Sequence, residues 1–139
     1  MKDRVFLDTN ILVYAYDRHD SRKQGLAQSL LIDVMESESG ALSVQVLGEF
    51  FSVVTRQIKN PMTSDEAKKA IELFSNLLIQ EIDLAMVERA IDTHKIYRIS
   101  YWDALIVSAA ERAGCKQILS EDLNDSQFYH GLAVSNPFK

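Results

Sequence analysis

Cysteine is almost absent from this chain, which has 139 residues and one cysteine, Cys115. A lone cysteine cannot form an internal disulfide. Because no activating motif surrounds it, we interpret it as a small spacer in a turn rather than as a functional thiol. This composition excludes a small secreted fold held by disulfides and favours the cytoplasm as the compartment.

Long apolar runs are absent as well. No run approaches the ~18 residues that suggest a membrane-spanning helix, and the sequence shows no signal peptide before its first apolar segment. Low-complexity sequence, internal repeats and a linker rich in proline or glycine are also missing. We therefore expect one domain over residues 1–139, with no membrane contact.

Positive charge is in short supply, because 15 Lys and Arg residues stand against 20 Asp and Glu, a net charge of −5. A general nucleic-acid binder usually carries a basic surface, so the charge disfavours that class. An enzyme that reaches phosphates through a bound metal stays possible, because a metal site must itself be acidic. The positions of the acids therefore matter more than their sum.

Short apolar segments alternate with longer segments of helical periodicity. We expect strands at 5–7, 41–44, 81–84, 117–120 and 132–135. We expect helices at 11–16, 21–38, 45–59, from the capping box at Thr63 to about residue 80, and at 86–94 and 100–113. This alternation predicts an α/β fold, with a parallel sheet of four to five strands and helices on both faces.

Acidic residues gather where these expected strands end. Asp8 follows the first strand, and Glu49 lies early in the helix after the second strand. Asp103 lies in the first turn of the helix that leads to the fourth strand, and Glu121 and Asp122 follow that strand. In such sheets the functional crevice lies beyond the carboxyl ends of the strands. We therefore expect these acids to meet at one edge.

Each acid also has a structural explanation. Asp8 could cap the following helix, since Asp is among the best capping residues, and Asp103 completes a capping-box pattern with Ser100. Glu49 borders an apolar stripe, where glutamates are common. Glu121 and Asp122 could be turn residues. For each position taken alone, these explanations stay open.

Taken together, the acids favour a metal site. Carboxylates at one edge repel one another unless they are protonated or neutralised. Hard cations such as Mg²⁺ prefer oxygen ligands, so we expect Mg²⁺ or Mn²⁺ here, with Thr9 and Asn10 orienting Asp8 or hydrogen bonding to the site. The three histidines, at 19, 94 and 130, are scattered and form no zinc-type cluster.

Four segments of the chain, in this order and spacing, resemble the PIN domain: FLDTNILVY, GEFFSVVTR, SYWDALIVSAA and ILSEDLNDSQ. The resemblance covers essentially the whole chain and is nearest to VapC-like toxins of bacterial toxin–antitoxin pairs. It implies a metal-dependent endoribonuclease that forms homodimers and has a cognate antitoxin. It also implies these roles: Asp8, Glu49, Asp103 and Asp122 as the catalytic metal ligands, Ser120 as a supporting hydroxyl, and Glu121 as a residue that could share or replace the role of Asp122.

Basic and aromatic residues are candidates for contacts with partners. Arg56 and Lys59 share the side of Glu49, and a second basic cluster consists of Arg18, Arg22 and Lys23. Both groups could meet RNA phosphates, and a solvated polar face is the alternative explanation for each. We also expect four aromatic side chains to be exposed and to support self-association: Tyr97, Tyr101, Phe128 and Tyr129.

Two other functions are open at this point. A haloacid-dehalogenase-type phosphatase also has an aspartate after its first strand, but it has a second acid two residues on, where this chain has Asn10. A PIN fold used only for binding is the other alternative. Metal-dependent cleavage of RNA separates it from the nuclease.

Overall fold

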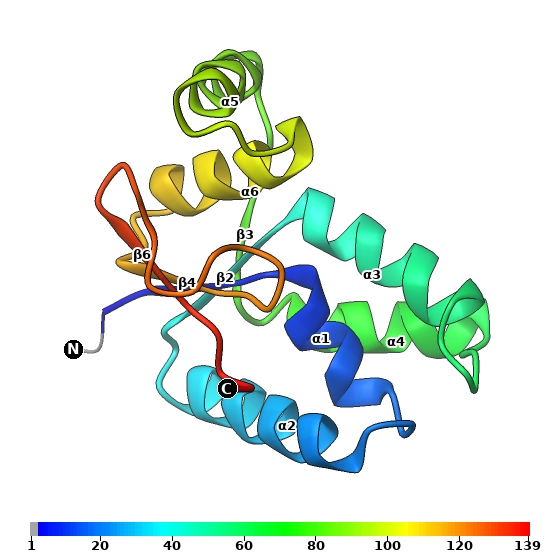
Figure 1. Cartoon of the computed structure of the whole chain (residues 1–139). Coiled ribbons are helices and arrows are strands. Elements are labelled where there is room, and N and C mark those ends of the chain that lie inside the picture. The colour runs from blue at the N-terminus through cyan, green and yellow to red at the C-terminus, as the bar shows by residue number, and fades with distance from the viewer. Residues whose placement is uncertain (1–2) are drawn as a thin grey trace.

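The structure, a computed structural model that describes residues 3–139, has an α/β architecture (Figure 1). Its strands are β1 (Val5–Leu7), β2 (Gly40–Ser43), β3 (Leu78–Gln80), β4 (Gln117–Leu119), β5 (Phe128–Tyr129) and β6 (Leu132–Ser135). Its helices are α1 (Thr9–Tyr16), α2 (Ser21–Glu36), α3 (Val44–Arg56), α4 (Ser64–Phe74), α5 (Leu84–Tyr97) and α6 (Tyr101–Arg112).

The sheet of residues 3–139 has six strands in the order β3-β2-β1-β4-β6-β5. Five strands are parallel, and β5 pairs antiparallel with β6. The predicted parallel sheet is thus confirmed, with one strand more than the four to five expected. The additional strand arises because His130 and Gly131 both have positive φ, 52° and 84°. Two such residues close a tight hairpin between β5 and β6.

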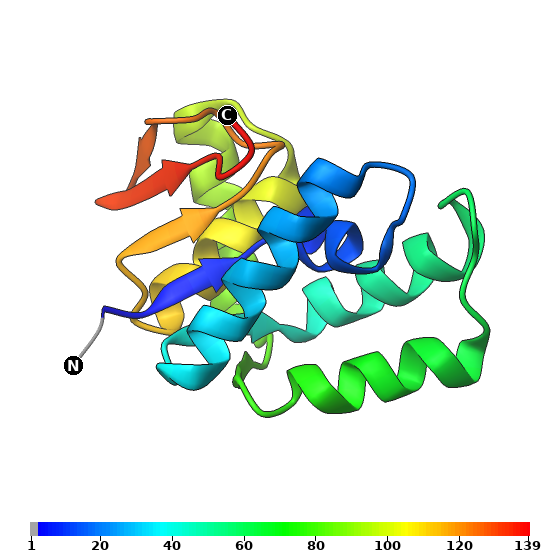
Figure 2. The same cartoon turned by 90° about the horizontal axis from the view of Figure 1, so that it is seen from below.

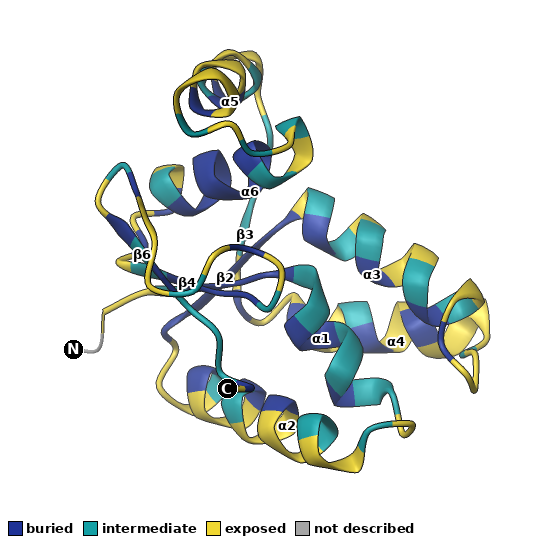
Figure 3. Ribbon diagram, viewed as in Figure 1, coloured by how far each residue is buried: buried dark blue, intermediate teal, exposed yellow. Residues whose placement is uncertain are grey.

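Helices cover both faces of the sheet, as predicted. In Figure 1, α6 and α5 lie above the sheet and α2 lies below it, and Figure 2 shows α2 crossing one face of the strands. Helix α6 packs against β2, β4 and β6 on one side and against α5 on the other. Its residues Ala104–Ala110 are all buried (Figure 3). An apolar helix between two layers has no side left for water.

The third strand lies earlier in the chain than expected, at Leu78–Gln80 rather than 81–84. Helix α4 ends at Phe74, because Ser75 Oγ and Asn76 Nδ2 donate to the backbone oxygens of Glu72 and Leu73. Downstream, the Asp83 side chain accepts a hydrogen bond from the Met86 backbone and caps α5. Competing caps at both ends therefore restrict the strand to the residues between them.

The strand order places a crevice beside β1. From β1 the chain passes to β2 on one side, and it later returns to β4 on the other side. At such a reversal of strand order a crevice forms outside the carboxyl ends of the strands, and α/β proteins bind ligands there. Asp8 directly follows β1, and Ser120 directly follows β4. None of the helices in the described part of the chain is long and apolar enough to cross a membrane.

Candidate functional site

Asp8 is a buried carboxylate, 5% exposed, between the ends of β1 and β4. Its Oδ1 accepts a hydrogen bond of 2.7 Å from the Thr9 backbone, so it caps α1. Its Oδ2 accepts a bond of 2.6 Å from Ser120 Oγ. Burial raises the pKa of Asp8 to about 6, and the charges of Asp122 and Asp103 act in the same direction, against the lowering by its two hydrogen bonds. Asp8 therefore both caps α1 and belongs to the acidic cluster.

Asp103 lies in the first turn of α6 and is half-buried. The N-cap of this helix is Ser100, whose Oγ accepts a bond of 3.1 Å from the Asp103 backbone. Burial raises the pKa of Asp103, and the charges of Asp122 and Glu49 raise it further. The carboxylate thus lies within the field of acids from two other segments.

Glu49, in α3, is held beside the end of β1. Its Oε1 accepts a bond of 2.6 Å from Thr9 Oγ1, and its Oε2 accepts one of 3.2 Å from Gln45 Nε2. The same Gln45 amide donates to the backbone oxygen of Trp102 at 3.2 Å. Gln45 therefore links the first turn of α3 to the first turn of α6, next to two of the acids.

Gln45 is a residue that the sequence analysis missed. It occupies the first turn of the helix after the second strand, and the rule applied to the acids would have included it. Its Oε1 is buried and has no hydrogen-bond partner among residues 3–139. A buried oxygen without a partner is costly, so packing alone does not explain why glutamine occupies this position.

Asp122 is fixed by residues from the ends of two strands. Ser120 Oγ accepts bonds from the backbones of Asp122 and Leu123 at 3.1 and 3.2 Å. Asn10 Nδ2 donates to Asp122 Oδ2 at 3.1 Å, and Asn10 Oδ1 accepts from the Glu121 backbone at 3.1 Å. A phosphatase of the dehalogenase type has its second acid at the position of Asn10. In this chain the Asn10 amide instead hydrogen bonds to two residues of the segment after β4.

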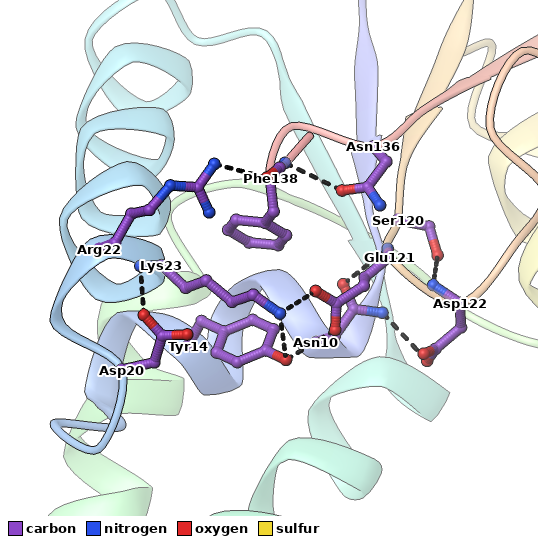
Figure 4. A network of polar contacts seen from close by, with 10 residues as sticks. All are labelled: Asn10, Tyr14, Asp20, Arg22, Lys23, Ser120, Glu121, Asp122, Asn136 and Phe138. Atoms are coloured by element: carbon purple, nitrogen blue, oxygen red, sulfur yellow. Dashed lines mark hydrogen bonds and ion pairs between the residues drawn. The ribbon is translucent and has the colours of Figure 1, made fainter.

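Glu121 points the other way, into a network with α1 and α2 (Figure 4). Its Oε1 accepts a bond of 2.6 Å from Tyr14 OH, and its Oε2 forms an ion pair with Lys23. Burial acts to raise the pKa of Glu121, but the hydrogen bonds from Lys23 and Tyr14 hold this pKa below its usual value. The main charges that raise the pKa values of Asp8 and Asp103 include Asp122 and not Glu121.

The four acids come together at one edge, but they do not form a finished metal site. Within residues 3–139, no three Asp, Glu, His or Cys side chains are placed so that they could hold a metal ion together. The hydrogen bonds just described explain this arrangement. Glu49 is turned to Thr9 and Gln45, and Asp122 is turned to Asn10.

A cavity of about 1030 Å³ opens from the acidic edge between α1 and α3. Its lining includes Glu49 and Asp122 at one end and Lys59 at the other. Lys59 also borders a second hollow of about 910 Å³, together with Arg18. A path thus leads from the acids to two of the five basic residues singled out in the sequence.

The other three basic residues are placed differently. Arg56 is exposed and does not line this cavity. Arg22 donates to the backbone oxygen of Phe138 at 2.6 Å. Lys23 lies against the rings of Tyr14 and Phe138, 4.7 and 5.6 Å from their centroids, besides its ion pair. Arg22 and Lys23 therefore already have partners within the chain.

The expected exposed aromatics need a correction. Tyr129 is 1% exposed, and its ring meets that of Tyr97 edge-on at 5.0 Å. The expectation of exposure for Tyr129 was wrong, because its side chain points inward from the short strand β5 that the sequence analysis did not predict. Tyr97 and Tyr101 are only partly exposed, because both pack against the hydrophobic core. Phe128 is 60% exposed, as expected. Trp102, which the sequence analysis did not single out, is 61% exposed.

Comparison with solved structures finds the same fold in toxins of toxin–antitoxin systems. The sarcin-ricin loop cleaving toxin VapC20 of Mycobacterium tuberculosis is 20% identical, with a TM-score of 0.66 over 85% of this chain and 89% of that one. A toxin–antitoxin complex from Klebsiella pneumoniae is 18% identical, with a TM-score of 0.68 over 96% and 97%. VapBC2 from Rickettsia felis, bound to a DNA fragment from its promoter, is 20% identical, with a TM-score of 0.67 over 95% and 97%.

Comparison with curated protein sequences gives no significant match. The family model of the PIN domain, by contrast, matches residues 5–130, which include every acid described above. The match agrees with the order of strands, the acidic edge and the solved structures of the same fold. This chain belongs to the PIN domain family.

Proposed function

We propose that this chain is a metal-dependent endoribonuclease that hydrolyses RNA phosphodiester bonds in the cytoplasm, as the toxin of a toxin–antitoxin pair. The observation that carries the proposal is the convergence of carboxylates from four separate segments at the carboxyl ends of the strands. Their mutual charge contributes to the raised pKa values of Asp8 and Asp103. Membership of the PIN domain family and the fold shared with VapC toxins support it.

The donor set fits a hard divalent cation by its chemistry. All four side chains offer carboxylate oxygens, which Mg²⁺ and Mn²⁺ prefer. A cation bound by all four would replace the hydrogen bonds that now hold Glu49 and Asp122. It would also remove the repulsion that raises the pKa values of Asp8 and Asp103. We propose Asp8, Glu49, Asp103 and Asp122 as the ligands.

The residues of the chain have separate tasks in this proposal. A bound Mg²⁺ or Mn²⁺ would supply positive charge to the phosphoryl oxygens and would lower the pKa of a water molecule. The Thr9 backbone and Ser120 orient Asp8, and Asn10 holds the segment that carries Asp122. No histidine base is needed, since the acids and the cation together perform both tasks.

The partners in this proposal are RNA, a cognate antitoxin and a second copy of the chain. The similar structures from Klebsiella pneumoniae, Rickettsia felis and Salmonella typhimurium are toxin–antitoxin or VapBC assemblies, which supports the antitoxin. We expect light scattering to give the mass of a dimer. A purely monomeric species at high concentration would remove the homodimer from the proposal.

The substitution Asp8→Asn tests the metal site. Asparagine keeps the volume and can still accept the bond from the Thr9 backbone, so a residue that only caps α1 loses little. It lacks the charge that a hard cation needs. We expect the variant to fold, to be at least as stable as wild type in chelator, and to lose both cleavage of total RNA and stabilisation by Mg²⁺. Asp103→Asn should behave alike.

The control is Asp92→Asn, which makes the same chemical change at an exposed position of α5 outside the cluster. It should keep the metal response and the cleavage. The measurement is melting temperature with and without metal, because a ligand that binds only the folded state stabilises it. If Asp8→Asn cleaves RNA at the wild-type rate and melts with the same metal response, Asp8 is only a cap.

A further inference from the structure

Trp102 is the single tryptophan of the chain, and it lies directly before Asp103 in the first turn of α6. Its side chain is 61% exposed, although the seven residues Ala104–Ala110 that follow in the same helix are buried. Aromatic side chains of this size usually bury most of their surface. This ring therefore remains in water beside the acidic edge.

The position of Trp102 is well defined. The ring of Tyr101 meets its ring edge-on, with centroids 5.0 Å apart and an interplanar angle of 75°. Its backbone oxygen accepts a hydrogen bond from Gln45, the residue that also donates to Glu49. Gln45 and its neighbour Val44, itself 43% exposed, line the 1030 Å³ cavity. The backbone of Trp102 is thus held by a residue that lines this cavity and contacts Glu49, and Trp102 directly precedes Asp103 in the chain.

Some of the basic residues near the acids already have partners within the chain. Lys23 is paired with Glu121 and Arg22 with the backbone of Phe138, whereas Lys59 lies at the far end of the cavity and Arg56 is exposed. The net charge of the chain is −5. A contact that does not depend on charge would therefore add to the affinity for RNA at this edge.

We propose that Trp102 is a stacking platform for a base of single-stranded RNA, next to the phosphate that faces the acids. This inference rests on the proposed function and adds a residue that contacts a base beside the acidic edge. Unpaired bases stack on aromatic side chains, and every base has a face that permits this contact. Bases inside a duplex are already stacked on their neighbours, so the platform selects unpaired RNA.

The intrinsic fluorescence of the protein reports on this residue directly, because the chain has no other tryptophan. The experiment titrates the wild-type protein, in chelator to prevent cleavage, with a short single-stranded RNA. A parallel titration uses a ribose-phosphate chain of the same length without bases. We expect quenching by the RNA and none by the abasic chain, which keeps the phosphates but has nothing to stack.

Variants test the contribution to affinity, measured by the anisotropy of a labelled RNA. Trp102→Leu should weaken binding by about 5- to 150-fold, the range expected for the loss of one stacked base. Trp102→Phe keeps a ring and should lose less. The control is Leu84→Ala at the start of α5, an apolar side chain that is also exposed, at 74%, and lies outside the acidic edge. It should bind RNA as wild type does.

Three outcomes would overturn the inference. The first is RNA binding with equal quenching by the abasic chain, or with unchanged affinity in Trp102→Leu. The second is a shift of the emission with protein concentration in the absence of RNA, which would place Trp102 in a contact between copies of the chain. The third is no binding of RNA in the anisotropy assay, which would overturn the proposed function as well and so differs from the first two.

Discussion

At the scale of the residue, Asp8 shows that capping a helix and lying in an acidic cluster are compatible roles for one side chain. The sequence offered capping and metal binding as alternatives. In the structure one oxygen caps α1 and the other meets Ser120 beside the other acids. A residue that only caps a helix gains nothing from burial, which raises its pKa to about 6. Helix capping alone therefore does not explain why Asp8 is buried.

The raised pKa of Asp8 predicts how stability changes with pH in the metal-free protein. The folded state keeps the proton up to about pH 6, whereas the unfolded chain releases it near the ordinary value of 3.8. The folded state therefore binds more protons between these values. The contribution of Asp8 to stability should therefore fall by about 3 kcal/mol as the pH rises from about 4 to about 6, and stay level above.

The measurement is urea unfolding in chelator between pH 4 and pH 7. Asp8→Asn should remove this contribution, so the stability of wild type relative to the variant should fall with pH over this range. In the variant, the raised pKa of Asp103 and the lowered pKa values of Glu66, Asp83 and Glu111 act in opposite directions. Mg²⁺ should bind more weakly below about pH 6, where protons compete for the carboxylates. An identical pH dependence in wild type and Asp8→Asn would show that Asp8 is not the titrating group.

Which of two adjacent acids serves the site is a second question at this scale. We expect Asp122→Asn to lose the metal response of the melting temperature. Glu121→Gln should keep the response, because Glu121 is already neutralised by Lys23, and it should melt slightly lower for the loss of that ion pair. Lys23→Met is the matched control, with a similar small loss and the metal response intact. The reverse pattern for the two acids would exchange their roles.

At the scale of the element, the ends of strands and helices were harder to predict than their order. The alternation of apolar segments with helical periodicity was enough for the parallel sheet. The range 81–84 also reads as a strand, but Asp83 caps α5 instead. Likewise, the direction of Glu121 depends on Tyr14 and Lys23, which are 107 and 98 residues away in the chain. The sequence around Glu121 does not predict contacts with residues so far away in the chain.

The close packing of β2 on its neighbours gives a prediction for Gly40. A Cβ at this position would lie 2.9 Å from Leu77 Cδ2 and 3.0 Å from Val34 Cγ2. Gly40→Ala should therefore destabilise the protein by about 1–3 kcal/mol. Gly25→Ala is the control, because a Cβ there meets nothing within 4 Å and α2 gains a better helix former, worth about 0.5–1 kcal/mol. Melting temperatures that move in the same direction for both would contradict this account.

At the scale of the whole molecule, the strand order decides where the chemistry can lie. The place of the four acids could be anticipated, because the carboxyl ends of parallel strands share an edge. Gln45 and Trp102 were not anticipated as part of this edge, since neither is acidic. Their relevance depends on a hydrogen bond between two helices, from Gln45 Nε2 to the backbone of Trp102. Such a contact is fixed by three-dimensional packing rather than by spacing along the chain.

The hydrogen bond from Ser120 to Asp8 joins residues 112 positions apart, and so does the bond from Asn10 to Asp122. A ribosome therefore exposes Asp8 long before it has made the residues that complete the edge. During most of its own synthesis the nascent chain has no assembled acidic cluster, and contacts of such long range form late in folding. If the chain is the ribonuclease proposed here, the messenger that encodes it is translated almost to the end before the new molecule can cut RNA.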